Sequence, residues 1–281
     1  MSDVKIFGMK KILYLFGAVI LLTCCAQKPY VIVQVADAQL GFTAAVEAGR
    51  NGGVYTGDLS YETGFLKKAV AQINEIGPDA VVFTGDQIHV SGDKDQWDTF
   101  ARIISEINPD IRVFHLPGNH DVIIKGSQVD CAPFTDRYGQ DRFLHCEKGV
   151  RLVGINTNLI KYGDPREAEQ LEWLRQSLVK EDKSEVSLVF GHHPFFLDDI
   201  DEPDSYFPID SSKRRLYFDM FSQVGLDVVY AGHKHDTYHS EYAGIPMRTT
   251  TSSAYQLGAS KPSIRVITVI DGTVTDSLLE L

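Results

Sequence analysis

The chain has 281 residues, which is enough for one large α/β domain or two small ones. Hydrophobic residues make up 43% and charged residues 23%, a composition typical of globular proteins. The formal net charge is -11, from 38 acidic and 27 basic residues, and this balance argues against a nucleic-acid partner because Lys and Arg hold phosphate backbones.

The first 28 residues have the pattern of an export signal. Two lysines precede an apolar run from residue 12 to residue 23, which is shorter than the roughly 20 residues of a membrane span. The ending Leu21-Leu22-Thr23-Cys24 resembles a bacterial lipoprotein signal, in which a cysteine is acylated after cleavage. We therefore expect attachment to a membrane of the bacterial cell envelope, outside the cytoplasm, through Cys24 or Cys25, with Cys24 favoured. The alternative is a plain cleaved signal and a soluble secreted or periplasmic protein.

Residues 29–281 are expected to form a single domain, whose first half alternates between strand and helix patterns. Three short runs rich in β-branched residues predict buried strands, at residues 30–36, 80–83 and 111–114. Two amphipathic patterns predict helices, at residues 65–76 and 96–107. The Gly-rich stretch from residue 41 to residue 63 is expected to be a loop.

The second half of the domain is richer in strands. Residues 142–146 and 150–155 predict an antiparallel pair joined through Lys148-Gly149, and residues 167–179 predict a helix. Further strands are predicted at residues 186–190 and 228–231, with three more in the tail from residue 246 to residue 279. This order predicts an α/β fold in which two sheets pack face to face with helices outside.

Other charged and sulfur-containing residues permit narrower statements. The triplet Lys213-Arg214-Arg215 is expected to be a solvated helix start. Cys131 and Cys146 are either paired, as an oxidising compartment would allow, or free. Neither belongs to a CxxC pattern, which argues against a cysteine-based zinc site.

Five short segments end in residue types that bind metals: Asp37-Ala38-Gln39, Gly85-Asp86, Gly118-Asn119-His120-Asp121, Gly191-His192-His193 and Gly232-His233-Lys234-His235. Four of them directly follow a predicted strand, and ligands in α/β folds bind at the carboxyl ends of strands. Carboxylate oxygen, amide oxygen and imidazole nitrogen together suit Mn, Fe or Zn and are a poor set for calcium. Two metals roughly 3.5–4 Å apart could share Asp86 and hold a hydroxide between them. His192 is favoured over His193 as a ligand, because His193-Pro194 begins a turn.

The order of these motifs resembles the calcineurin-like metallophosphoesterase family over nearly the whole predicted domain. The resemblance implies a four-layer αββα sandwich, two mixed sheets flanked by helices, with a dinuclear metal site that hydrolyses phosphate esters. It also implies which residues hold each metal: Asp37, Asp86 and His235, with Gln39 as a possible fourth, for one; Asp86, Asn119, His192 and His233 for the other.

Two positions depart from the usual family pattern. The first motif is usually Asp-x-His, where this chain has Gln39, and the second usually ends in Asp, where this chain has His89. These two residues, together with the segments 198–207 and 252–258, resemble one branch of the family, which contains a eukaryotic serine/threonine protein phosphatase. A neutral amide oxygen binds metal more weakly than imidazole, so we expect the first metal site to be labile.

The resemblance implies a phosphatase that hydrolyses phosphomonoesters by attack of a metal-bridging hydroxide. Together with the signal pattern, it predicts a lipid-anchored enzyme. His120 is the candidate general acid for the leaving alkoxide, and Asp121 is expected to hydrogen-bond its ring and keep it protonated. The stretch 41–63 and the acidic loop 198–210 are expected to wall the substrate, with Tyr206 and Phe207 near the leaving group. One alternative is a phosphodiesterase acting on a small or lipid-derived substrate. An alternative of another class is a non-catalytic lipoprotein that binds metal or phosphate.

Overall fold

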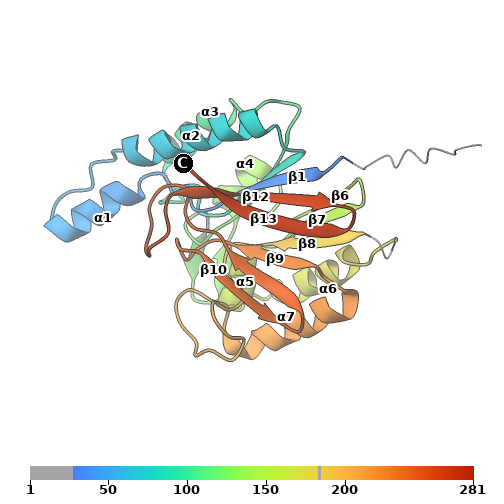
Figure 1. Ribbon diagram of the computed structural model, residues 1–281. Coiled ribbons are helices and arrows are strands. Elements are labelled where there is room, and N and C mark those ends of the chain that lie inside the picture. The colour runs from blue at the N-terminus through green and yellow to red at the C-terminus, as the bar shows by residue number, and fades with distance from the viewer. Residues whose placement is uncertain (1–27, 183–184) are drawn as a thin grey trace, which may run out of the picture.

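Two mixed β-sheets pack face to face in the computed structural model, which describes residues 28–182 and 185–281 (Figure 1). The strands of the first sheet are β1 (Tyr30–Val35), β2 (Ala80–Thr84), β3 (Arg112–Leu116), β12 (Ser263–Ile270) and β13 (Thr273–Glu280). The strands of the second sheet are β6 (Phe143–Glu147), β7 (Val150–Gly154), β8 (Val186–Phe190), β9 (Val228–Ala231), β10 (Tyr238–Tyr242) and β11 (Ile245–Thr249). Their orders are β13-β12-β1-β2-β3 and β10-β11-β9-β8-β7-β6. The predicted signal and its lipid-bearing cysteine lie outside the described residues.

Helices cover the outer face of each sheet and complete four layers (Figure 1). Over the first sheet lie α2 (Ser60–Ile76), α3 (Lys94–Ile104) and α4 (Ala132–Tyr138), with a short hairpin of β4 (Ile123–Lys125) and β5 (Gln128–Asp130). The helix α1 (Phe42–Asn51) contacts α2 and projects beyond the end of the sheet (Figure 1). Over the second sheet lie α5 (Thr157–Tyr162), α6 (Glu167–Ser177) and α7 (Ser211–Val224). None of the helices in the described part of the chain is long and apolar enough to cross a membrane.

Burial on both faces explains why β1 is apolar at every position except Gln34. Ile32 packs into the core between the two sheets, whereas Val33 and Val35 pack into the core under α2 and α3. The intervening Gln34 is fully buried, and its amide nitrogen donates to the Thr84 hydroxyl and to the Ala231 carbonyl, both at 3.0 Å. Because Ala231 ends β9 of the second sheet, this side chain links the two sheets beside the ends of their central strands.

The parallel strands set the position of the site. β1, β2 and β3 run parallel in the first sheet, and β7, β8, β9 and β11 run parallel in the second. The carboxyl ends of parallel neighbours meet at one edge of a sheet. Residues that follow β1, β2, β3, β8 and β9 are therefore brought to a common edge of the sandwich.

The four-layer α/β fold and the predicted strands are confirmed, but two expectations about local structure need correction, and the open question of the two cysteines is answered. The stretch 41–63 is not a loop, because it contains α1 and the first turn of α2; Gly52, with φ 59° and its N–H bonded to the Ala48 carbonyl, ends α1 rather than preventing it. Arg214 is fully buried and not solvated, because its guanidinium donates to the carbonyls of Ile200, Glu202 and Ile209. The two body cysteines are free, with Cys131 buried and Cys146 exposed.

Candidate metal centre

All five metal-binding motifs lie at the common edge of the two sheets. Asp37 and Gln39 follow β1, Asp86 follows β2, and Asn119 and His120 follow β3. His192 follows β8, and His233 and His235 follow β9. The backbone N–H of His233 donates to both carboxylate oxygens of Asp37, at 3.1 and 2.9 Å, which joins the motif of one sheet to that of the other.

One group of these residues converges on the ring of His192. Its Nε2 atom lies 3.1 Å from Asn119 Oδ1, 3.1 Å from His233 Nδ1 and 3.3 Å from Asp86 Oδ2. A single N–H can satisfy only one of these atoms well, so the other lone pairs are left facing each other. Asp86, His192 and His233 thus offer ligand atoms within 4.8 Å of one another, as a metal ion requires.

A second group uses the other side of Asp86. Asp37, Asp86 and His235 also present ligand atoms within 4.8 Å of one another, and His235 Nε2 lies 3.5 Å from Asp37 Oδ1. Gln39 lines the same pocket, and its buried Oε1 atom has no hydrogen-bond partner. An unpartnered buried oxygen is costly unless something absent from the protein atoms satisfies it, and a cation does so. The donor set therefore fits two ions that share Asp86.

Backbone strain marks the same positions. Asp37, Gln39, Asp86, His233 and His235 all have positive φ angles, between 39° and 68°, in a region that residues other than glycine rarely adopt. Such conformations cost on the order of 1–3 kcal/mol each and gather at functional sites. Within residues 28–182 and 185–281, eight residues other than glycine have a positive φ, and five of these are predicted metal ligands, an association that the sequence could not reveal.

Glycine is required where the loops of β2 and β3 approach each other. A Cβ atom at Gly118 would lie 2.0 Å from Asp86 Oδ1 and 2.2 Å from the Asp86 backbone nitrogen. A Cβ atom at Gly85, where φ is 91°, would lie 2.6 Å from His192 Nδ1. Both glycines therefore allow the shared carboxylate to sit against the neighbouring loop.

Backbone carbonyls orient two of the imidazoles. His192 Nδ1 lies 2.9 Å from the Thr84 carbonyl oxygen, and His235 Nδ1 lies 2.5 Å from that of Tyr255. Since a carbonyl oxygen only accepts, each Nδ1 carries the proton and each Nε2 faces the other ligand atoms. This arrangement fixes the ring and its tautomer in metal sites. The neighbouring His193 ring lies within hydrogen-bond distance of the Thr157 hydroxyl, 3.2 Å away, and belongs to neither ligand group, which favours His192.

Burial and charge shift the ionisation of the site in opposite directions. Burial raises the pKa of Asp37 well above its usual range. Burial also opposes ionisation of Asp86, but His192 and His120 beside it hold the pKa of that carboxyl below its usual value. Burial alone would lower the pKa of His192, but the Asp86 carboxylate raises it to about 9, so a bound cation would take the place of that proton. Burial lowers the pKa of His235 to about 4, which leaves its imidazole neutral at pH 7.

The expected hydrogen bond between Asp121 and the His120 ring is wrong. The buried Asp121 carboxylate instead accepts from the backbone N–H groups of Gln87, at 3.0 Å, and Gly118, at 2.8 Å, so it braces the two loops. His120 Nδ1 lies 2.8 Å from the backbone carbonyl oxygen of His89, to which it donates. The His89 ring also stacks on that of His120, with centroids 4.7 Å apart and planes 25° apart.

A small pocket of about 160 Å³ opens directly on the ligand groups. The expected wall residues Tyr206 and Phe207 line it, as does His120. Phe42, from the stretch 41–63 that was expected to wall the substrate, lines it as well, and so does Leu257. No wall role was expected for Leu257, because an apolar residue has no metal-binding chemistry that would mark it in the sequence.

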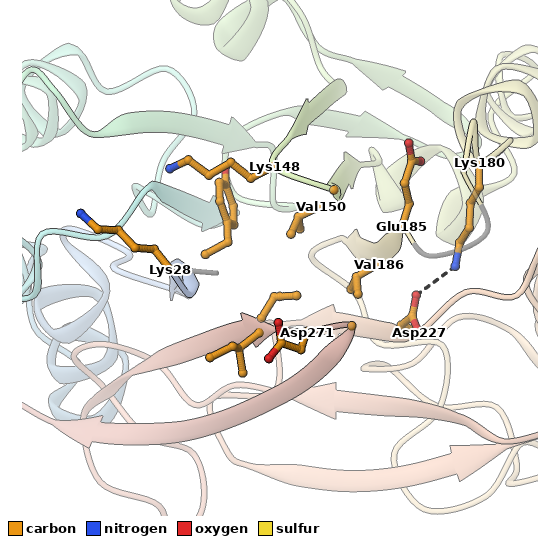
Figure 2. Close-up of a pocket in the computed structure, with 13 residues that line it drawn as sticks. Lys28, Lys148, Val150, Lys180, Glu185, Val186, Asp227 and Asp271 are labelled. Carbon is orange, nitrogen blue, oxygen red and sulfur yellow. Dashed lines mark hydrogen bonds and ion pairs between the residues drawn. The ribbon is translucent and has the colours of Figure 1, made fainter. Parts of the chain in front are cut away.

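A larger hollow of about 720 Å³ lies at the opposite end of the central strands (Figure 2). It is lined by residues at strand beginnings, among them Tyr30, Val150 and Val186, and by Lys180, which pairs with Asp227 at 3.2 Å. None of the predicted ligands belongs to this hollow. Size therefore does not identify the site, whereas the converging ligand atoms do.

Comparison with known proteins agrees with this geometry. The model of the calcineurin-like phosphoesterase family matches residues 54–237, a span that contains four of the five motifs. The chain belongs to the calcineurin-like phosphoesterase family. It is a metal-dependent phosphoric ester hydrolase of the dinuclear type, and the predicted family, fold and enzyme class are confirmed.

Two groups of relatives place the chain within this family. The chain is similar to proteins named serine/threonine-protein phosphatase CPPED1. The protein of Rattus norvegicus is 28% identical over 254 residues, which cover 86% of this chain and 80% of the relative. The protein of Bos taurus is 29% identical over 261 residues, which cover 88% of this chain and 82% of the relative. A probable cyclic nucleotide phosphodiesterase of Rhodococcus erythropolis is 24% identical over 191 residues, covering 63% of this chain and 58% of that protein.

Solved structures share the fold. A dimetal phosphatase of Danio rerio has a TM-score of 0.59 at 15% identity, covering 89% of this chain and 98% of that one. The purple acid phosphatase PPD1 of yellow lupin (Lupinus luteus) has a TM-score of 0.65 at 14% identity, and 90% of this chain is covered. The match spans about half of the lupin chain, 52% of it.

Proposed function

We propose that this phosphoesterase hydrolyses phosphomonoesters, with Mn, Fe or Zn as its two ions. The observation that carries the proposal is the pair of ligand groups that share Asp86 beside a pocket of about 160 Å³. A monoester turns three free oxygens toward the ions and has one organic group to accommodate.

His120 would act on the leaving group, and the seven predicted ligands would hold the ions. These ligands are Asp37, Gln39, Asp86, Asn119, His192, His233 and His235. Bound ions would neutralise the phosphoryl oxygens and lower the pKa of the attacking water. The backbone N–H of His120 donates to Asp86 Oδ1 at 2.9 Å, and its Nδ1 donates to the His89 carbonyl. These contacts leave Nε2 free for the pocket, and in the imidazolium form of the ring this atom would donate its proton to the departing alkoxide.

His89 supports this role of His120 without touching the substrate. Its carbonyl fixes the His120 tautomer and its ring limits rotation of the His120 ring. The departure from the family pattern at position 89 thus affects the proposed general acid, not the ions. We treat His89 as a positioning residue.

We further propose that the protein is lipid-anchored through Cys24, or through Cys25, on the outer side of a bacterial membrane. The support is the signal-like sequence and the geometry of β1: Tyr30 begins this strand beside the large hollow, whereas Asp37 follows its other end. An anchor only a few residues before Tyr30 would leave the metal centre pointing away from the bilayer. This orientation favours a water-soluble ester over a membrane lipid. A Cys24→Ser variant that remains in the membrane fraction while Cys25→Ser is released would assign the lipid to Cys25.

The proposed activity is tested with purified protein lacking residues 1–23. Its metal content is measured after loading with Mn, Fe or Zn, and rates are compared on an aryl phosphate, a bis-aryl phosphate and a phosphoserine peptide. We expect two ions per chain and faster hydrolysis of the monoester. Faster hydrolysis of the diester would support the phosphodiesterase alternative. Two bound ions with no hydrolysis of any ester would support the non-catalytic alternative.

A further inference from the structure

The small pocket at the metal centre has two chemically different walls. One is polar and consists of predicted ligands together with His120. The other is apolar and consists of four side chains from three separate segments: Phe42, Tyr206, Phe207 and Leu257. We call these four residues the apolar wall.

The rings of the apolar wall flank both ion sites. Phe42 packs against His235, with centroids 5.5 Å apart, and edge-on against Tyr255 at 5.0 Å. On the other side, Tyr206 and Phe207 pack against His233 at 5.2 and 5.5 Å. A phosphoryl group held between the two sites would therefore have aromatic faces on either side of it.

Part of the apolar wall is left in solvent. Tyr206 is 61% exposed and Leu257 is 48% exposed, although both border a catalytic pocket. Apolar area that becomes buried on binding contributes about 25 cal/mol per Å², so a substrate that covers these side chains gains affinity.

No basic side chain lines the pocket, since none of its lining residues is Lys or Arg. Two cations lie close to it: Lys234 Nζ lies 4.3 Å from the centre of the Phe207 ring, and Arg50 donates to the Tyr255 hydroxyl at 3.2 Å. Selection by the apolar wall therefore comes from its apolar area and not from a lack of positive charge nearby.

We propose that the apolar wall is a leaving-group subsite, which selects monoesters of apolar, ring-bearing alcohols over small ones. The proposal rests on the phosphomonoesterase function above. Water adds to phosphorus, the bond from phosphorus to the ester oxygen breaks, and that oxygen leaves as the alcohol with a proton from His120. Because His120 and the apolar wall line the same pocket, an ester oxygen beside His120 places its organic group against the apolar wall.

The test compares kcat/KM for 2-phenylethyl phosphate, ethyl phosphate and 3-carboxypropyl phosphate, whose alcohols have similar acidity and so similar intrinsic reactivity. We expect the phenylethyl ester to be at least tenfold better than the ethyl ester, and better than the carboxypropyl ester, whose charged end gains nothing from an apolar surface. Leu257→Ala should reduce the phenylethyl-to-ethyl ratio about threefold. Leu216→Ala is the matched control, because Leu216 is also 48% exposed but lies on α7 and does not line the pocket.

The outcomes separate this inference from the function on which it rests. Hydrolysis of all three esters with a phenylethyl-to-ethyl ratio near one, or an equal loss of that ratio in both leucine variants, overturns the subsite alone. Absence of hydrolysis of all three esters by protein that holds two ions overturns the proposed function, and the subsite with it. A tenfold ratio that falls only in Leu257→Ala supports both.

Discussion

The substitution Gly118→Ala tests how tightly the loops of β2 and β3 must approach to hold the shared carboxylate. The added Cβ atom would lie 2.0 Å from Asp86 Oδ1 and 2.2 Å from the Asp86 backbone nitrogen, whereas ordinary contacts of this kind are about 3.4 Å or longer. One of the loops must therefore move by roughly 1 Å. A misplacement of about 1 Å at a catalytic centre can reduce turnover about 10²-fold. We expect at least that loss, together with weaker binding of both ions because both share Asp86.

The assay measures ions per chain, turnover of an aryl phosphate and the midpoint of thermal unfolding. Gly64→Ala is the control, because Gly64 lies within α2 and a Cβ atom there meets nothing within 4 Å. In that helix the change should leave turnover intact and raise stability by up to about 1 kcal/mol. Turnover within twofold of the parent in Gly118→Ala, with two ions bound, would refute the reasoning.

Three further predictions concern single residues. His120→Ala should lower turnover by about 10²–10⁴ while both ions remain bound, since His120 donates a proton and holds no ion; unchanged turnover of an alkyl phosphate would remove it from the mechanism. Gln39→His should tighten the weaker ion site in a metal titration, because imidazole is a better donor than an amide; equal affinity would count against Gln39 as a ligand. His115 stacks between Phe83, at 5.0 Å, and Tyr138, at 4.1 Å, and burial lowers its pKa to about 3. The folded chain therefore favours the proton-free imidazole, whereas the unfolded chain binds a proton below a pH of about 6.5. The free energy of unfolding should therefore decrease as the pH falls below about 6.5. Urea unfolding at pH 7 and 4.5 should therefore show His115→Phe losing less stability than the parent, by on the order of 2 kcal/mol, and an equal loss would contradict the assignment.

The sequence predicts those parts of the fold in which the local pattern of apolar residues indicates burial. The β1 run is apolar at successive positions because Ile32 and Val33 enter different cores, and this double burial is visible in the sequence. The helix α1 was missed because glycine was given more weight than the Ala-rich segment before Gly52. Arg214 was assigned to solvent because the sequence does not reveal the backbone carbonyls that surround it.

Part of the site can also be predicted from the sequence and part cannot. The proximity of the predicted ligands could be predicted because they follow strands whose ends meet, and the structure brings them together. Their role as ligands stays a prediction. The partner of His120 could not be inferred, since Asp121 is its neighbour in sequence but points to the amides of the β2 loop, and the carbonyl of His89 takes its place. The apolar wall comes from three segments without any shared motif, so only the fold reveals it.

The most direct test of the account is the number of ions bound by Asp86→Asn compared with the parent chain, measured at equilibrium with Mn, Fe or Zn. Asp136→Asn is the control, because Asp136 is an exposed aspartate on α4, away from the motifs. We predict two ions per chain for the parent and for Asp136→Asn, and at most one, weakly held, for Asp86→Asn. Two ions bound with unchanged affinity by Asp86→Asn would contradict a centre built on a carboxylate shared at position 86.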